Sequence, residues 1–126
     1  LEFRYTWSTS DEFGFVRDAE LTNLGGRDCV VDVLDGLQNI LPANTPLFTQ
    51  TNVSNLVDAY KRSEVDPDSG LGIFSLSAGI TDRAEALESL RANVVWCCGL
   101  EGHRANLSPA IVEAFRQGRV TPAGTV

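Results

Sequence analysis

The chain has 126 residues, of which 43% are apolar and 21% are charged, a balance typical of one soluble domain. Ten basic and 17 acidic residues give a net charge of −7, which argues against nucleic acid or an anionic membrane surface as a partner. The sequence has no run of about 18–20 apolar residues, so no membrane-spanning helix is predicted.

The first predicted strand lies at the N-terminus, where three aromatic residues alternate with polar ones: Phe3, Tyr5 and Trp7. This period of two predicts a half-buried strand with an aromatic face. A turn at Asp11–Gly14 follows. The next two apolar alternations, Phe15–Asn23 and Asp28–Asp35, flank a glycine-rich turn, and we expect them to pair as a hairpin.

The middle of the chain is interrupted by Pro42 and Pro46. Apolar residues at helical spacing then predict a turn of helix near Asn52–Val57, with Asn52 as its N-cap. We expect this helix to pass into a strand from Tyr60 to Val65.

Turn residues at Asp66–Gly70 predict a hairpin that leads into an apolar strand, Leu71–Ala78. The pattern of Thr81–Leu90 fits a helix or an extended segment, and both alternatives stay open. Alternating apolar residues in Arg91–Cys98 predict a central strand. Ser108 and Pro109 then predict the start of a helix.

Gly118 is expected to end this last helix, and the tail Arg119–Val126 is expected to fray. Strand signals outnumber helical ones, so the fold class is mainly β. We expect residues 1–126 to form one antiparallel β-sandwich, incomplete at this length, with one or two short helices. The alternation predicts a mostly buried core: Phe3, Tyr5, Trp7, Phe15, Val31, Val33, Phe74, Leu76, Val94 and Trp96.

Few residues carry recognisable chemistry. Cys29, Cys97 and Cys98 lack the spacing of a zinc or redox motif, which predicts buried thiols in a reducing, cytoplasmic compartment. His103 stands alone between Gly102 and Arg104 and is predicted to be a solvated loop residue. The sequence has no phosphate-binding loop and no nucleophile elbow. We therefore expect no cofactor, no metal and no catalytic residue in this chain.

Three pairs of carboxylates are predicted to be solvated surface or turn residues: Asp32 with Asp35, Asp66 with Asp68, and Glu85 with Glu88. A different set, Tyr60, Lys61, Arg62 and Glu64, places one ring and three charges on one short strand. Such a set is typical of a surface that contacts carbohydrate or another domain, because the arginine guanidinium hydrogen-bonds hydroxyls or carboxylates and the tyrosine ring provides a stacking face. The competing interpretation is a core tyrosine beside a surface ion pair.

Several longer phrases resemble the N-terminal β-sandwich region of bacterial proteins of the cellobiose phosphorylase family: YTWSTSDEFGFVRDAELTNLG (Tyr5–Gly25), LDGLQNILPAN (Leu34–Asn44) and SNLVDAYKRSEVDPDSGLGIFSLSAGITDRAE (Ser54–Glu85). The resemblance implies a galactose-mutarotase-like super-sandwich that precedes a helical catalytic domain. It also implies phosphorolysis of β-glucosides, with a general-acid aspartate in that helical domain. The domain would follow Val126, so no catalytic residue is assigned in this sequence.

Three hypotheses remain. The chain is a non-catalytic fragment of a glycoside phosphorylase or hydrolase, with the absent catalytic domain as its partner; the lack of any methionine favours a piece of a longer protein. Alternatively it is a stand-alone carbohydrate-binding module with an oligosaccharide ligand. The third hypothesis is a scaffold or dimerisation domain that forms homo-oligomers through exposed strand edges.

Overall fold

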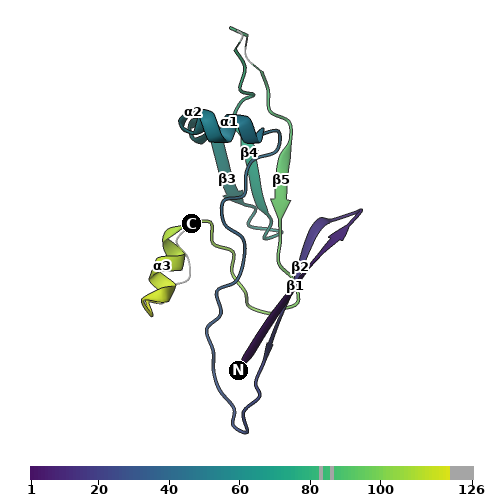
Figure 1. The fold of residues 1–126 in the computed structure, drawn as a ribbon, viewed down its shortest axis with the longest axis vertical. Coiled ribbons are helices and arrows are strands. Elements are labelled where there is room, and N and C mark those ends of the chain that lie inside the picture. Colours follow the sequence, from purple (N-terminus) through teal and green to yellow (C-terminus); the bar gives the residue numbers. More distant parts are fainter. Residues whose placement is uncertain (83, 86, 120–126) are drawn as a thin grey trace. The chain divides into compact units, whose positions relative to one another are not determined.

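A computed structural model describes residues 1–82, 84–85 and 87–119 of the chain. These residues form five β-strands and three short helices, and every strand pairing is antiparallel. Two compact units are distinguished, Leu1–Val33 and Leu34–Val126, and Figure 1 draws the elements of both. The prediction of a mainly β chain is confirmed, with three short helices where one or two were expected. Within the described part, no helix has the length and apolarity to cross a membrane.

The first unit is a hairpin of β1 (Glu2–Ser10) and β2 (Gly14–Thr22), paired from Glu2 opposite Thr22 to Ser10 opposite Gly14. Ser10 Oγ accepts hydrogen bonds from the amides of Glu12 and Phe13, both 3.2 Å long, and Gly14 takes a φ of +71°. The predicted turn at residues 11–14 therefore closes the hairpin.

The predicted pairing of Phe15–Asn23 with Asp28–Asp35 is wrong. Residues 28–35 form no strand, and β2 pairs with β1 instead. The shorter turn brings Phe3 opposite Leu21 and so joins two matching apolar alternations. The predicted turn after β2 does form, because the Asn23 side chain accepts a hydrogen bond from the Gly25 amide and donates one to the Arg27 carbonyl, each 2.9 Å long.

The second unit begins with two short helices, α1 (Leu47–Asn52) and α2 (Ser54–Tyr60), and α2 continues directly into β3 (Lys61–Val65). The predicted passage from helix to strand is confirmed. The prediction that Asn52 caps the helix is wrong, because Val53 occupies the N-cap of α2. The Asn52 side chain instead donates to the Phe48 carbonyl inside α1, at 2.8 Å.

Strands β4 (Gly72–Leu76) and β5 (Ala92–Val95) complete a sheet in the order β3-β4-β5. The predicted turn at Asp66–Gly70 joins β3 to β4, and the Asp66 amide donates to the Leu71 carbonyl at 2.9 Å. The prediction of a central strand at Arg91–Cys98 is wrong in position, because β5 is an edge strand and β4 lies at the centre.

The last element is α3 (Ala110–Arg116), and Gly118 ends it with a φ of +66° as expected. Pro109 occupies the N-cap, so the expected cap by the Ser108 side chain does not form. The expectation for Thr81–Leu90 falls partly outside the described residues, and the described part of that segment contains no helix. The expected fraying falls on the tail, of which residues 120–126 lie outside the described range.

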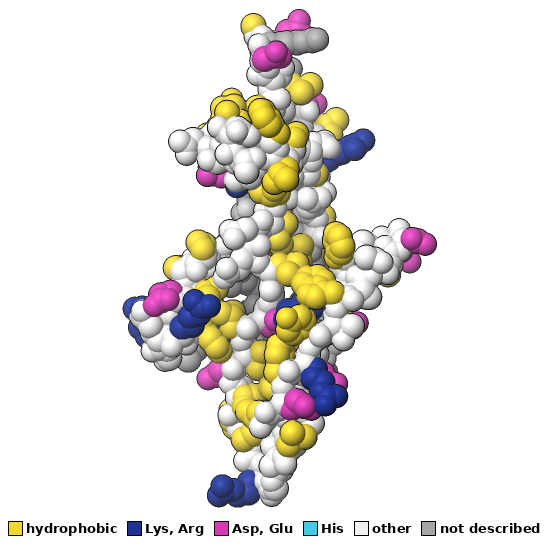
Figure 2. All heavy atoms as spheres, in the orientation of Figure 1, with side chains coloured by type: hydrophobic (Ala, Val, Ile, Leu, Met, Phe, Trp, Pro, Cys, Tyr) yellow, Lys and Arg dark blue, Asp and Glu magenta, His cyan; other side chains and the backbone are white. Residues whose placement is uncertain are grey.

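The core is small, and most of the predicted core residues are not buried. Val57 is fully buried and Leu76 is 5% exposed. Eight of the ten predicted core side chains are instead exposed, Trp96 at 46% and Phe15 at 82% among them. Figure 2 shows hydrophobic side chains at the visible surface of both units. Alternation determines which side chains share a face, but burial also requires a second layer over that face.

Only one face of the three-stranded sheet is covered within its unit. The Asn93 side chain on β5 donates to the Leu41 carbonyl at 2.8 Å, which ties the segment before α1 to this face. Leu76 belongs to the same face by register and shares a cavity lining with Thr49 of α1. Coverage on this side explains why Leu76 is buried while residues on the other side are not.

Candidate functional site

The uncovered face of the sheet, here called the open face, is set by the strand register. Arg62 lies opposite Ser75, which lies opposite Ala92. In the next row Glu64 lies opposite Ile73, which lies opposite Val94. Side chains of directly opposed residues point to the same side of a sheet. The open face therefore comprises six residues: Arg62, Glu64, Ile73, Ser75, Ala92 and Val94.

The four residues singled out in the sequence do not all lie on this face. Arg62 and Glu64 do, and both are exposed. Lys61 points to the covered side, and its Nζ lies 2.6 Å from Asp58 Oδ1 on α2. Tyr60 is half-buried at the end of α2, where its carbonyl accepts a hydrogen bond from the Ser77 amide at 2.8 Å. Arg62 and Glu64 therefore point outward from the sheet, whereas Tyr60 and Lys61 lie where α2 joins β3.

The outward pair carries two charges that are not neutralised within the described part of the chain. Neither Arg62 nor Glu64 forms an ion pair or side-chain hydrogen bond with another described residue. Beside them Ile73 is half-buried and Val94 is 42% exposed. The open face thus combines three apolar residues on β4 and β5, Ile73, Ala92 and Val94, with two charges on β3.

The hairpin carries a second notable surface, here called the aromatic face. By register it comprises eight residues: Phe3, Tyr5, Trp7, Thr9, Phe15, Arg17, Ala19 and Leu21. The guanidinium carbon of Arg17 lies 4.8 Å from the ring centroid of Tyr5 and 5.9 Å from that of Trp7. Sequence reasoning found the alternation but assigned these aromatic residues to a core. Arginine within an aromatic alternation was the available signal that the face is not purely a packing surface.

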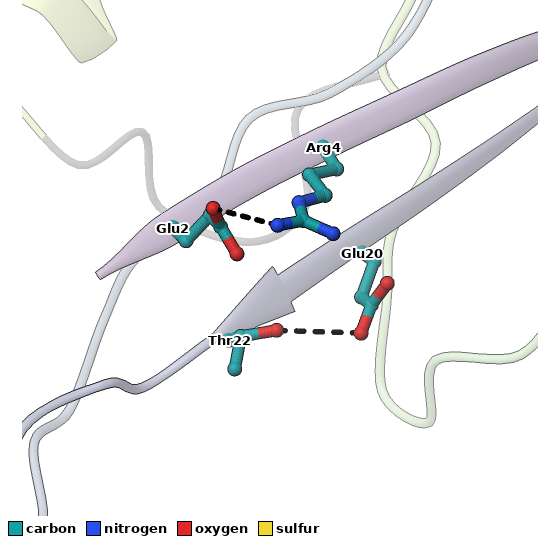
Figure 3. Close-up of polar contacts among 4 residues, drawn as sticks. All are labelled: Glu2, Arg4, Glu20 and Thr22. Atoms are coloured by element: carbon teal, nitrogen blue, oxygen red, sulfur yellow. Dashed lines mark hydrogen bonds and ion pairs between the residues drawn. The ribbon is translucent and has the colours of Figure 1, made fainter.

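The opposite face of the hairpin is polar. Arg4 Nη2 donates to Glu2 Oε1 at 3.0 Å, and the Thr22 hydroxyl donates to Glu20 Oε1 at 3.3 Å (Figure 3). Both contacts join residues two positions apart along one strand, so they reinforce the polar side of each strand. The hairpin is therefore amphipathic, with the aromatic side chains of its strands on one side and mostly polar residues on the other, where Val16 is an exception.

The described part of the chain brings together no three residues of the histidine, cysteine, aspartate and glutamate types that could hold a metal ion. His103 is exposed in a loop, as predicted, with Nδ1 at 2.7 Å from the Leu100 carbonyl oxygen. The predicted burial of the cysteines is wrong, because Cys29, Cys97 and Cys98 are exposed free thiols. Each lies outside the strands, where no layer covers it.

Asp66 acts in a turn and does not pair with Asp68 as a catalytic couple. Its Oδ2 accepts hydrogen bonds from the Ser69 hydroxyl and from the Ser69 amide, the latter at 3.0 Å. The side-chain bond from Ser69, followed by the backbone bond, lowers the pKa of the Asp66 carboxyl. Both bonds favour the ionised form, which stabilises the turn between β3 and β4.

A cavity of about 360 Å³ beside Leu76 offers no catalytic pair either. Its lining combines aliphatic, hydroxyl and amide groups with one carboxylate, from Glu88, and one guanidinium, from Arg91. Glycoside hydrolysis uses two carboxyl groups that flank the scissile bond. Among the described residues of this lining, Glu88 supplies one such carboxyl group.

Comparison with protein-family models gives no match for this chain. A search of curated proteins also finds no matching relative.

Proposed function

We propose that this chain is a non-catalytic β-module of a carbohydrate-active enzyme and that its open face docks on another part of that enzyme. The occupant is a second apolar sheet, so that the three-stranded sheet becomes one layer of an antiparallel β-sandwich. The parent is a β-glucoside phosphorylase or a related hydrolase, as the resemblance of Tyr5–Gly25, Leu34–Asn44 and Ser54–Glu85 implies. The apolar sheet belongs to the remainder of that parent, which also holds the helical catalytic domain, the second partner of this module.

One observation carries the docking part of the proposal. On the open face Ile73 lies on the central strand and Val94 beside it on β5, and the charges of Arg62 and Glu64 lie on the other edge strand, β3, without partners among the described residues. Covering this face would remove apolar surface from water, at about 25 cal/mol per Å². Opposite charges on the occupant would then satisfy Arg62 and Glu64 and fix its orientation. The three free thiols fit the proposed cytoplasmic location.

A stand-alone carbohydrate-binding module is the second candidate, and the aromatic face of the hairpin favours it. Tyrosine and tryptophan combine an apolar ring face with a polar tip, which suits the C–H faces and hydroxyls of sugars. The two candidates differ in which sheet binds and in what it binds. They can therefore be tested separately.

The docking proposal is tested by isothermal titration of this chain with the remaining part of its natural reading frame. Arg62→Ala should weaken binding at least tenfold, because a charge-assisted contact contributes about 1.5–3 kcal/mol. The affinity of Arg62→Lys should lie between those of wild type and Arg62→Ala, since lysine keeps the charge but lacks the planar guanidinium. Arg4→Ala is the matched control, because Arg4 is also an exposed arginine on a strand.

Wild-type affinity in the Arg62→Ala variant, with unchanged far-UV circular dichroism, would refute the docking proposal. A natural reading frame without a further domain would refute it as well.

A further inference from the structure

We infer that the cavity of about 360 Å³ beside Leu76 binds a small zwitterion with an apolar body, of which an aliphatic α-amino acid is the simplest example. The cavity lies where four segments of the second unit meet: the residues before α1, α1 itself, the end of β4 with the residues after it, and the residues before β5. It is on the covered side of the sheet. The inference therefore goes beyond the proposed docking of the open face and does not depend on it.

The cavity lining includes a buried hydroxyl group that lacks a hydrogen-bond partner. Thr45 Oγ1 is buried and bonds to no donor or acceptor among the described residues. Leaving such a group unpaired is costly, so buried hydroxyls in native proteins almost always have a partner. Pro46 restricts the backbone of Thr45 to an extended conformation, and the β-branched side chain has few rotamers. The hydroxyl is therefore held in place, where a ligand in the cavity would pair with it.

Two opposite charges line the same cavity without neutralising each other. Glu88 and Arg91 form no ion pair with each other, and neither pairs with another residue in the described ranges. A simple anion would be attracted by Arg91 but repelled by Glu88, and a simple cation would meet the reverse. A zwitterion satisfies both charges, because its carboxylate accepts hydrogen bonds from the guanidinium while its ammonium donates to the carboxylate of Glu88.

The apolar part of the lining indicates the size and polarity of the ligand's body. Leu76 is 5% exposed, Ile80 is half-buried, and Leu87 adds a third aliphatic side chain. Gly79 fixes this wall, because its amide donates to the Leu87 carbonyl at 2.6 Å and an added Cβ would lie 2.5 Å from Leu87 Cδ2. Small-molecule sites occupy about 300–1,000 Å³, so a cavity near the lower end of that range suits a ligand of the size of leucine.

The experiment follows binding of L-leucine to the full chain by NMR of the nitrogen-15-labelled protein. Two analogues each lack one charge: 4-methylpentanoate lacks the ammonium, and 3-methylbutylamine lacks the carboxylate. L-leucine should bind at least about tenfold more tightly than either analogue, because each charge makes a charge-assisted hydrogen bond. The amides of Thr45, Gly79, Ser89 and Arg91 should shift with the same midpoint. No binding of L-leucine, or equal binding of either analogue, would overturn the inference.

Substitutions at the two charged positions assign the ends of the ligand. Arg91→Gln should weaken L-leucine binding about tenfold and remove its advantage over 3-methylbutylamine. Glu88→Gln should remove its advantage over 4-methylpentanoate in the same way. The matched controls are Arg4→Gln and Glu101→Gln, exposed residues outside the lining, and they should stay within about twofold of wild type. A preference for L-leucine that survives in both lining variants would contradict the assignment.

Thr45→Val separates ligand binding from a structural role, because valine keeps the shape of the side chain and removes the hydroxyl. Without ligand, loss of an unpartnered hydroxyl should leave the urea midpoint unchanged or raise it. Binding of L-leucine should nevertheless weaken about fivefold, whereas Thr45→Ser, which retains the hydroxyl, should bind within about threefold of wild type. A lower urea midpoint in Thr45→Val, or an unchanged affinity for L-leucine in that variant, would overturn the inference.

Discussion

At the scale of single residues, Asp66 shows how a local hydrogen bond determines the properties of a charged side chain. The Ser69 hydroxyl and amide both donate to its carboxylate and lower its pKa. A folded-state pKa below the unfolded value contributes stability that is complete above the unfolded pKa, near 4, and is lost as the pH falls through the folded pKa. The turn between β3 and β4 should therefore weaken only in acid.

Replacing Ser69 tests this directly. Ser69→Ala removes the hydroxyl donor but keeps the amide, so the pKa of Asp66 should rise toward its ordinary value without reaching it. Carbon-13 NMR titration of the side-chain carboxyl measures the change. Ser69→Thr retains a hydroxyl and is the control. An Asp66 pKa that is the same in wild type and Ser69→Ala would show that this hydrogen bond does not hold the carboxylate.

At the scale of elements, the hairpin depends on the backbone conformation of Gly14. Its φ of +71° lies in the left-handed region, and a Cβ there would meet no atom within 4 Å. Gly14→Ala should therefore destabilise the hairpin through backbone strain alone, by about 1–2 kcal/mol. Gly14→Asn should cost less, because asparagine tolerates this region. Urea unfolding followed by Trp7 fluorescence in the Trp96→Phe background measures both changes.

Gly26→Ala is the matched control for this prediction. Gly26 also has no atom within 4 Å of an added Cβ, but its φ is not in the left-handed region. The Gly26→Ala substitution should leave the urea midpoint nearly unchanged. Equal effects at Gly14 and Gly26 would mean that the turn does not limit hairpin stability.

The three-stranded sheet depends on its covered side. Leu76 is 5% exposed on the central strand, so Leu76→Ala should cost about 2–3 kcal/mol. Leu100, which is 61% exposed, supplies the control, and Leu100→Ala should change stability by less than about 0.5 kcal/mol. Equilibrium denaturation followed by circular dichroism compares the two variants. A larger loss in Leu100→Ala would contradict the placement of the core.

Sequence reasoning located the strands better than it located their partners. The alternation in residues 3–7, 15–21 and 72–76 was sufficient to place strands there, because a period of two matches the pleat of a strand and not the turn of a helix. Two turn signals flanked β2, at residues 11–14 and 23–26, and the local pattern did not distinguish which one closes the hairpin. The turn at residues 11–14 closes the hairpin, and the register across it places the apolar residues of β1 and β2 on the same side of the sheet.

The candidate site was predicted in part. The sequence predicted a strand from Tyr60 to Val65 with Tyr60, Arg62 and Glu64 on one face, whereas the strand in the structure is Lys61–Val65. Tyr60 instead ends α2, and Lys61 is paired with Asp58 of the same helix. Where helix ends and strand begins depends on contacts between segments, which a local pattern does not contain. The aromatic face was missed as a site because alternating aromatic residues ordinarily indicate a core.

At the scale of the whole molecule, both units present apolar or aromatic side chains that no second layer covers within that unit. A net charge of −7 opposes self-association of such surfaces. Strands β3 and β5 are sheet edges, and both hairpin strands have one unpaired edge. Homo-oligomers through these edges remain a prediction. The proposed docking of the open face would cover Ile73 and Val94 without self-association.

The most direct test of this account is hydroxyl-radical footprinting of the isolated chain and of the complete product of its natural reading frame. The account predicts that oxidation of Ile73 and Val94 falls several-fold in the complete protein, because docking covers the open face. Val30, which is 99% exposed and lies outside the sheets, should be oxidised equally in both. Equal oxidation of Ile73 and Val94 in the two samples would contradict the account.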